Sequence, residues 1–248
     1  MSNPRIRRLR DSEEKILRES SMIKIAYKTF QIQKYQWGNL NHKTALLIHG
    51  WEGRSGNFAA IINILLQKKY NVIAFDAPSH GKSSIAKTTM FEFAEFLETQ
   101  FPILNPELVL SHSFGSVNTA TVLKNNPDLN INMWIMITTP HQFLTRINEI
   151  SKHFGLYNNT KTELITRIQN DAKTNINQLD MAVYCRELSN VKKAIIVHSK
   201  TDTLLPIEGA REVAKSFTRS ELIELNDLGH YSILWSDELK RIIVENVT

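Results

Sequence analysis

Short apolar runs alternate along this chain with segments whose apolar residues recur at helical spacing. The runs are rich in β-branched residues and are mostly bounded by Gly, Pro, Asp or Ser. Continuous apolar runs of this length are typical of parallel strands that are covered on both faces. The predicted strands are Thr44–Ile48, Asn71–Phe75, Leu108–Leu110, Met133–Ile137, Lys193–Val197 and Glu221–Leu225.

The segments between these strands predict helices. In one of them Ile61, Ile62, Leu65 and Leu66 fall on the same side of a helix. Another begins directly after Pro206, where proline suits the first turn. Strands that alternate with helices indicate right-handed βαβ units and an open, mostly parallel sheet with helices on both faces. The predicted helices are Phe58–Gln67, Met90–Phe101, Gly115–Lys124, Ile207–Phe217 and Ser236–Val247.

Two regions interrupt this alternation. Residues Met22–Trp37 contain two further strands, which we expect to form an antiparallel edge of the sheet. Residues 141–190, approximately, contain helical fragments but no clear strand, and they lie between two core strands. We interpret them as a helical lid over one end of the sheet. With no internal repeat or long linker, residues 1–248 are predicted to form a single α/β domain with this lid insertion.

Composition excludes several classes of function. No stretch approaches the roughly 18 apolar residues of a membrane-spanning helix, so no membrane span is predicted. The net charge is +5, but the basic residues form no stripe interleaved with aromatics, and we expect no nucleic-acid partner. The arginine-rich N-terminus does not resemble a secretory signal, and the lone Cys185 fits a reducing compartment. These features predict a cytoplasmic protein and leave its oligomeric state open.

The strongest chemical signal is the sequence LSHSFG at residues 110–115, which follows an apolar strand and opens a helix. A nucleophilic serine at such a turn sits on a strained backbone, with its hydroxyl above the sheet and small residues two positions to either side. Ser113 is therefore the candidate nucleophile. Gly115 satisfies the pattern, whereas Ser111 stands where glycine is usual. The alternative is that Ser113 is an ordinary helix N-cap.

A serine hydroxyl needs a base, and the order along the chain points to one. The order Ser, Asp or Glu, His is matched by His230, after the last strand, and by Asp202, in the loop after the preceding strand. Because both loops leave the carboxyl ends of strands, we expect His230 and Asp202 beside Ser113. Alternatives remain open: Asp202 as a helix cap, Asp227 as a local partner of His230, and Asp180 or Glu187 in place of Asp202.

The same edge of the sheet offers donors for the negative charge that develops on a carbonyl oxygen during acyl transfer. The Phe114 N–H directly follows the nucleophile, and the Trp51 N–H lies in the loop after the first core strand, where Gly50 permits a close turn. The remaining histidines at strand ends, His49, His112 and His198, are interpreted as structural or pocket-lining. No histidines have the spacing of a zinc site, so no metal is predicted.

Taken together, these motifs resemble the α/β-hydrolase superfamily, in particular its bacterial esterase, lipase and serine-aminopeptidase-like branches. The resemblance runs from about Thr44 to the C-terminus and has two departures: Ser111, and a lid without a recognisable substrate signature. It is carried by His49-Gly50-Trp51, Asp76-Ala77-Pro78-Ser79-His80-Gly81-Lys82-Ser83, Ser111-His112-Ser113-Phe114-Gly115, Asp202 with Pro206, and Gly229-His230.

The resemblance implies an α/β-hydrolase fold with a lid over an acyl pocket and no cofactor. It implies Ser113 as nucleophile, His230 as base, Asp202 as acid, and the N–H groups of Trp51 and Phe114 as oxyanion donors. In this family the stretch around Asp76 and His80 builds a turn, through hydrogen bonds of the aspartate to its own backbone.

The predicted function is a serine hydrolase that cleaves an ester or related acyl bond of a small-molecule substrate through an acyl-enzyme intermediate. An aminopeptidase, a thioesterase or a carbon–carbon bond hydrolase would use the same three residues, and an aminopeptidase would need lid carboxylates such as Glu149 or Glu163 to bind an ammonium group. The third class of hypothesis is a non-catalytic ligand-binding protein with the same fold.

Overall fold

A computed structural model describes residues 4–5, 8–156 and 159–248 of the chain. Within these residues one sheet of eight strands runs in the order β1-β2-β4-β3-β5-β6-β7-β8. The pairs β1–β2 and β2–β4 are antiparallel, and every other neighbouring pair is parallel. The strands are β1 Ser21–Tyr27, β2 Phe30–Trp37, β3 Thr44–Ile48, β4 Asn71–Phe75, β5 Leu108–His112, β6 Ile131–Ile137, β7 Val191–Ser199 and β8 Ser220–Leu225.

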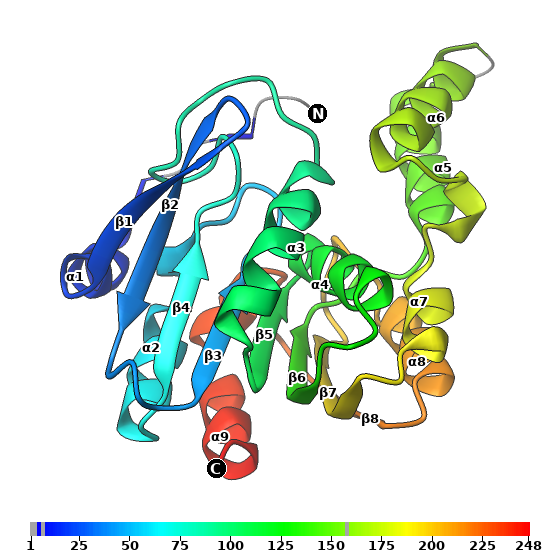
Figure 1. Ribbon diagram of the computed structural model, residues 1–248. Coiled ribbons are helices and arrows are strands. Elements are labelled where there is room, and N and C mark those ends of the chain that lie inside the picture. Colours follow the sequence, from blue (N-terminus) through cyan, green and yellow to red (C-terminus); the bar gives the residue numbers. More distant parts are fainter. Residues whose placement is uncertain (1–3, 6–7, 157–158) are drawn as a thin grey trace.

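Helices cover both faces of the sheet (Figure 1). Side chains alternate along each strand, so Leu46 and Ile48 of β3 belong to the core on the face covered by α3, α4, α7 and α8, whereas Leu47 belongs to the core on the face covered by α1, α2 and α9. The helices are α1 Asp11–Arg18, α2 Ala59–Gln67, α3 Glu92–Leu104, α4 Phe114–Asn125, α5 Phe143–Phe154, α6 Asn159–Ala172, α7 Met181–Glu187, α8 Ile207–Ser216 and α9 Asp237–Asn246, with 3₁₀ turns η1 Ser55–Phe58, η2 Ile176–Gln178 and η3 Ser232–Trp235.

The strand order places a crevice at one point of the sheet. The chain leaves β3 to form β4 on one side, then returns to form β5 on the other side of β3. The connections after β3 and β5 therefore diverge, and in open α/β sheets ligands bind beyond the carboxyl ends of strands at such a point. The loop after β3 contains Trp51, and the turn after β5 contains Ser113.

The predicted α/β architecture is confirmed, including the antiparallel edge formed by β1 and β2. Every predicted strand is present, and β5 and β7 continue two residues beyond their predicted ends, to His112 and Ser199. The sequence analysis missed α1, which buries few apolar side chains, among them Ile16 and Leu17. No helix of the described residues is long and apolar enough to cross a membrane.

The segment between β6 and β7 contains α5, α6, η2 and α7. In Figure 1, α5 and α6 project beyond the sheet, whereas α7 lies against α8. Helix α6 buries little of itself, with Ile168 its buried side chain. These helices follow Ile137 and precede Val191, and their interpretation as a lid insertion stays a prediction.

Candidate active site

Ser113 occupies the sharp turn between β5 and α4. Its backbone has φ 53° and ψ −126°, a sparsely populated conformation that surrounding structure must maintain. The turn forces the start of α4 close to the end of β3. A Cβ atom on Gly115 would lie 2.3 Å from the carbonyl oxygen of Ile48, so glycine is required there.

Ser111, the departure from the usual glycine, is accommodated by hydrogen bonds in the core. Its side chain is fully buried, and its hydroxyl oxygen accepts a 2.8 Å hydrogen bond from the indole N–H of Trp134. The hydroxyl also lies 2.9 Å from that of Ser116. A buried indole N–H needs an acceptor, and here the serine supplies it.

Replacing Ser111 by glycine is expected to destabilise the protein. Ser111→Gly leaves the Trp134 N–H buried without its acceptor, which costs about 1–3 kcal/mol of unfolding free energy. Urea denaturation of Ser111→Gly and Ser111→Ala measures this, since the alanine variant removes the hydroxyl without adding backbone freedom. A Ser111→Gly variant as stable as the parent would contradict this account of the substitution.

The structure brings together the three residues that the sequence placed on separate loops. The Nε2 atom of His230 lies 2.9 Å from the Ser113 hydroxyl oxygen, and its Nδ1 lies 2.8 Å from Oδ2 of Asp202. Both are ordinary hydrogen-bond distances. In the neutral tautomer with its proton on Nδ1, His230 donates to Asp202 and can accept the serine proton.

Both carboxylate oxygens of Asp202 form hydrogen bonds. Oδ2 faces His230, while Oδ1 accepts the backbone N–H groups of Leu204 and Leu205 at 2.8 and 3.0 Å. Burial raises the pKa of this carboxyl, but the hydrogen bonds from His230 and the backbone outweigh it and hold the pKa below its usual value. Asp202 is therefore ionised at neutral pH, although its side chain is buried.

The other acids considered as partners of the histidine have different contacts. Oδ1 of Asp180 accepts the Ala182 N–H and caps α7, and Glu187 pairs with Lys124 at 3.0 Å. Oδ1 of Asp180 also lies 3.5 Å from Nε2 of His141.

Two buried histidines secure the backbone around this arrangement. The Nε2–H of His112 donates to the carbonyl oxygen of His230 at 2.9 Å, and the Nε2–H of His198 donates to that of Leu205 at 2.8 Å. Burial, together with the nearby His230, lowers the pKa of His112 to about 3. Both histidines were expected to be structural or pocket-lining, but their particular partners are distant in sequence.

The loop after β3, residues 49–54, lies beside the nucleophile. A Cβ atom on Gly50 would lie 2.9 Å from that of Ser113. Trp51 and Phe114 line the same cavity as Ser113. The Phe114 N–H opens α4 and so has no acceptor within the helix. Among the residues that the structure describes, the Trp51 N–H has no acceptor either.

Three side chains join this loop to the segment after β4, namely His80 and Asp76 from that segment and His49 from the loop. His80 Nε2 accepts the Glu52 N–H at 3.1 Å, and His49 Nε2 accepts the Ala77 N–H at 3.0 Å. Asp76 accepts the N–H groups of Lys82 and Ser55, both at 2.8 Å. The expectation that Asp76 bonds its own turn is thus incomplete, because it also ties down the residues that follow the loop.

A model of the alpha/beta hydrolase fold matches residues 44–154. An esterase from Pyrococcus furiosus superposes with a TM-score of 0.72 at 19% identity, over 99% of this chain and 96% of that one. The chain has the α/β-hydrolase fold. Est1E from Butyrivibrio proteoclasticus, solved with ferulic acid bound, gives 0.70 at 16% identity over 91% and 99% of the chains. The thioesterase domain from the curacin biosynthetic pathway gives 0.67 at 15% identity, also over 91% and 99%. No curated protein matches the sequence.

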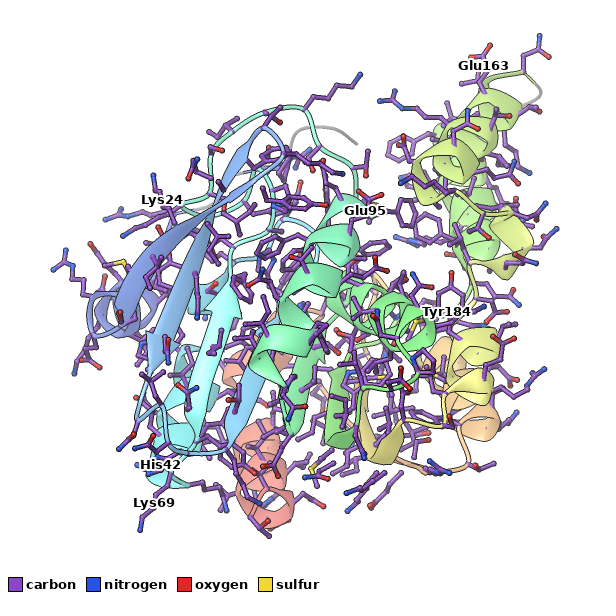
Figure 2. The ribbon with its side chains drawn as sticks, in the orientation of Figure 1. Lys24, His42, Lys69, Glu95, Glu163 and Tyr184 are labelled. Carbon is purple, nitrogen blue, oxygen red and sulfur yellow. The ribbon has the colours of Figure 1, made fainter. Side chains whose placement is uncertain are left out.

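The cavity of this α/β-hydrolase-fold protein has a volume of about 560 Å³ and contains Ser113 and His230 in its wall. Much of the wall is apolar, with α5 contributing Phe143 and Ile147 and α7 contributing Tyr184. Figure 2 marks Tyr184 where α7 passes α4. An extended apolar wall with a few polar groups suits a ligand with a hydrophobic part.

The two lid carboxylates considered for ammonium binding differ in position. Glu149 lines the cavity but pairs with Arg146 at 3.0 Å. Glu163 lies at the outer end of α6, away from the cavity (Figure 2). Among the described residues, no group of three or more His, Cys, Asp or Glu side chains is arranged to hold a metal ion. Cys185 is buried, and burial raises the pKa of its thiol.

Stability of this α/β-hydrolase fold is expected to fall as the pH drops below about 6.5, the ordinary pKa of histidine. Several buried histidines have pKa values lowered mainly by burial, so they stay neutral in the folded protein and take up protons on unfolding. Each such proton removes up to about 1.4 kcal/mol of unfolding free energy per pH unit. The histidines are His49, His80, His112 and His198.

Urea denaturation at pH 7.5 and 5.5 measures this loss. His112→Gln should reduce the pH dependence by up to one proton. An unfolding free energy independent of pH over this interval would show that the buried histidines do not stay neutral in the folded state.

Proposed function

We propose that this protein is a serine hydrolase that cleaves an ester or related acyl bond of a small molecule through an acyl-enzyme intermediate. One observation carries the proposal: a single imidazole lies within hydrogen-bond distance of both the Ser113 hydroxyl, at 2.9 Å, and the ionised Asp202, at 2.8 Å. A hydroxyl, an imidazole and a carboxylate in this order form a proton-transfer unit that recurs on unrelated folds.

In the first half of the reaction, Ser113 Oγ attacks the substrate carbonyl carbon while its proton passes to His230 Nε2. The resulting imidazolium is stabilised by Asp202, to which it donates through Nδ1. The bond to the leaving alcohol then breaks, and His230 returns the proton to the alcohol oxygen. Ser113 is left as an acyl ester.

In the second half, His230 takes a proton from water, and the hydroxide attacks the acyl carbonyl carbon. The bond to Ser113 Oγ breaks, the serine regains its proton from His230, and the acid departs. In both halves the oxyanion accepts hydrogen bonds from the N–H groups of Trp51 and Phe114. Such preorganised donors are each worth about 100- to 1,000-fold in rate.

The proposal includes the remaining expectations for substrate and location. The apolar cavity favours a small hydrophobic acyl substrate, and the similar structures include an esterase and a thioesterase domain. The same nucleophile, Ser113, would attack the carbonyl carbon of a thioester, of an aminoacyl amide, or of a ketone beside a carbon–carbon bond to be cleaved. The free Cys185 fits the cytoplasm that the sequence predicts, and we propose no cofactor, metal or nucleic-acid partner.

A fluorophosphonate probe tests the nucleophile without knowledge of the natural substrate. Intact mass should rise by one adduct, and peptide mapping should locate it on Ser113. A panel of ester, thioester and aminoacyl-amide substrates then identifies the bond. A protein that is neither labelled nor active on any member of the panel would instead be a non-catalytic binding protein with this fold.

A further inference from the structure

Helix α1 and the residue before it, Arg10, contact segments next to the Trp51 loop and the His230 loop, although they take no part in the proposed chemistry. The helix packs against η1, which directly follows the loop containing Trp51, and against α2. Ile16 and Leu17 are buried in the core on this face of the sheet. The helix is therefore fixed to the body of the protein and can serve as a rigid support.

Glu13 connects α1 to the loop that contains Trp51. The residue is 2% exposed, and its Oε1 accepts a 2.9 Å hydrogen bond from the side-chain N–H of Asn57. The Asn57 side-chain oxygen in turn accepts the Arg54 N–H at 2.9 Å. Oε2 of the same carboxylate accepts the Arg10 N–H at 3.1 Å, which closes the first turn of α1.

A second contact connects the start of α1 to the segment that follows His230. The guanidinium of Arg10 lies 3.4 Å from the centre of the Trp235 ring, in η3. That 3₁₀ turn begins two residues after His230, and its Ile233 N–H donates to the carbonyl oxygen of Gly229, the residue before His230. Upstream, the Arg5 N–H lies 3.3 Å from Glu52 Oε1, next to Trp51.

We propose that α1 is a positioning element of the active site, which fixes the position of the loop that contains Trp51 relative to the loop that contains His230. Glu13 acts through Asn57 on the first loop, and Arg10 acts through Trp235 on the second. The inference rests on the proposed hydrolase function. Neither Glu13 nor Arg10 touches the substrate or the reacting atoms, so both are positioning residues.

Loss of the contacts made by Glu13 or Arg10 should lower kcat and leave KM nearly unchanged. An oxyanion donor contacts the charge that develops in the transition state, and a displacement of about 1 Å at a catalytic group costs up to about 100-fold in rate. A loosened loop after β3 shifts the donor by less than that. Loss of the Glu13–Asn57 bond should therefore lower kcat about tenfold and leave KM within about twofold.

A reciprocal exchange tests the link. In Glu13→Gln the side-chain amide can take two orientations. Either its NH₂ group faces the NH₂ group of Asn57, and that bond is lost, or its oxygen faces Asn57, and the bond from the Arg10 N–H is lost. In Asn57→Asp two carboxylates face each other. The double variant restores an N–H donor opposite a carboxylate, and the new carboxylate still accepts the Arg54 N–H. Asn57→Asp should therefore lose kcat about tenfold, Glu13→Gln should lose less because one orientation of its amide keeps the bond to Asn57, and the double variant should regain most of the activity that Asn57→Asp loses.

The matched control is Glu14→Gln, the same change one residue along, at a side chain whose partner is the exposed Arg18 of the same helix. It should leave kcat unchanged. Arg10→Ala is the second test, because this exposed side chain contributes little to packing; kcat should fall about threefold, the value of one exposed cation–π contact.

Melting temperature and fluorophosphonate labelling of the parent separate the possible failures. An unlabelled, inactive parent refutes the proposed function. An active parent whose folded Asn57→Asp and Arg10→Ala variants keep full kcat refutes the positioning role alone. A double variant that folds but recovers no activity overturns the specific Glu13–Asn57 link. If Asn57→Asp does not fold, Arg10→Ala decides: unchanged kcat overturns the proposal and a threefold loss supports it.

Discussion

Ser113→Ala is expected to lower kcat by about 10⁵- to 10⁶-fold, while the unfolding free energy changes by less than about 1 kcal/mol. The change removes the atom that would form the acyl-enzyme, and no neighbouring hydroxyl lies at that point of the turn. The fold loses only the 2.9 Å hydrogen bond to His230. Alanine and serine meet the same steric cost at φ 53°, because both carry a Cβ atom.

Turnover of an ester found with the substrate panel, together with urea denaturation, measures both quantities. Ser116→Ala is the control: it removes a hydroxyl three residues along, where the partner is Ser111 rather than His230. It should retain activity within a few-fold. Full turnover by purified Ser113→Ala, free of contaminating host esterase, would refute the proposed nucleophile.

The core strands could be predicted because burial on both faces leaves a signal in the sequence itself. All five residues of β4 are buried, and after Asn71 the other four form an uninterrupted apolar run. The turn at Ser113 could be predicted for a similar reason. The backbone of β3 approaches so closely that position 115 must be glycine, and that requirement is visible without the fold.

Contacts between distant loops could not be predicted in the same way. The bond from His112 to the His230 carbonyl oxygen joins residues 118 positions apart, and no local pattern specifies it. Helix α1 was missed because much of its surface is polar, and its buried Glu13 would be taken for a solvated residue. Its function, as we infer it, depends on Asn57, 44 residues away.

The segment between β6 and β7, which we interpret as a lid, shows a further limit of prediction from sequence. Helical periodicity predicted helices between residues 141 and 190, but periodicity does not fix where a helix lies relative to the sheet. Only the structure distinguishes Glu149, in the cavity wall, from Glu163 at the outer end of α6. The order Ser113, Asp202, His230 gave more information because parallel strands bring their carboxyl ends to one edge, whatever the loops between them do.

Asp202→Asn is expected to lower kcat by about 10⁴-fold near neutral pH, with little change in the position of the side chain. The reason is the tautomer of His230. The two backbone N–H groups of Leu204 and Leu205 require an acceptor, so the new amide should point its oxygen toward them and its NH₂ group toward His230. Nδ1 must then accept, the ring proton moves to Nε2, and His230 can no longer take the serine proton.

The reverse orientation of the amide would rescue the tautomer, but it would place the NH₂ group against two N–H donors. The loss of both hydrogen bonds makes that orientation unfavourable. Asp227→Asn is the matched control, because Asp227 precedes His230 on the same loop and its φ of 56° suits asparagine. It should keep kcat within about twofold, since surface substitutions have small effects. Steady-state kinetics of the two variants decides the assignment: a large loss in Asp227→Asn together with an active Asp202→Asn would transfer the orienting role to Asp227.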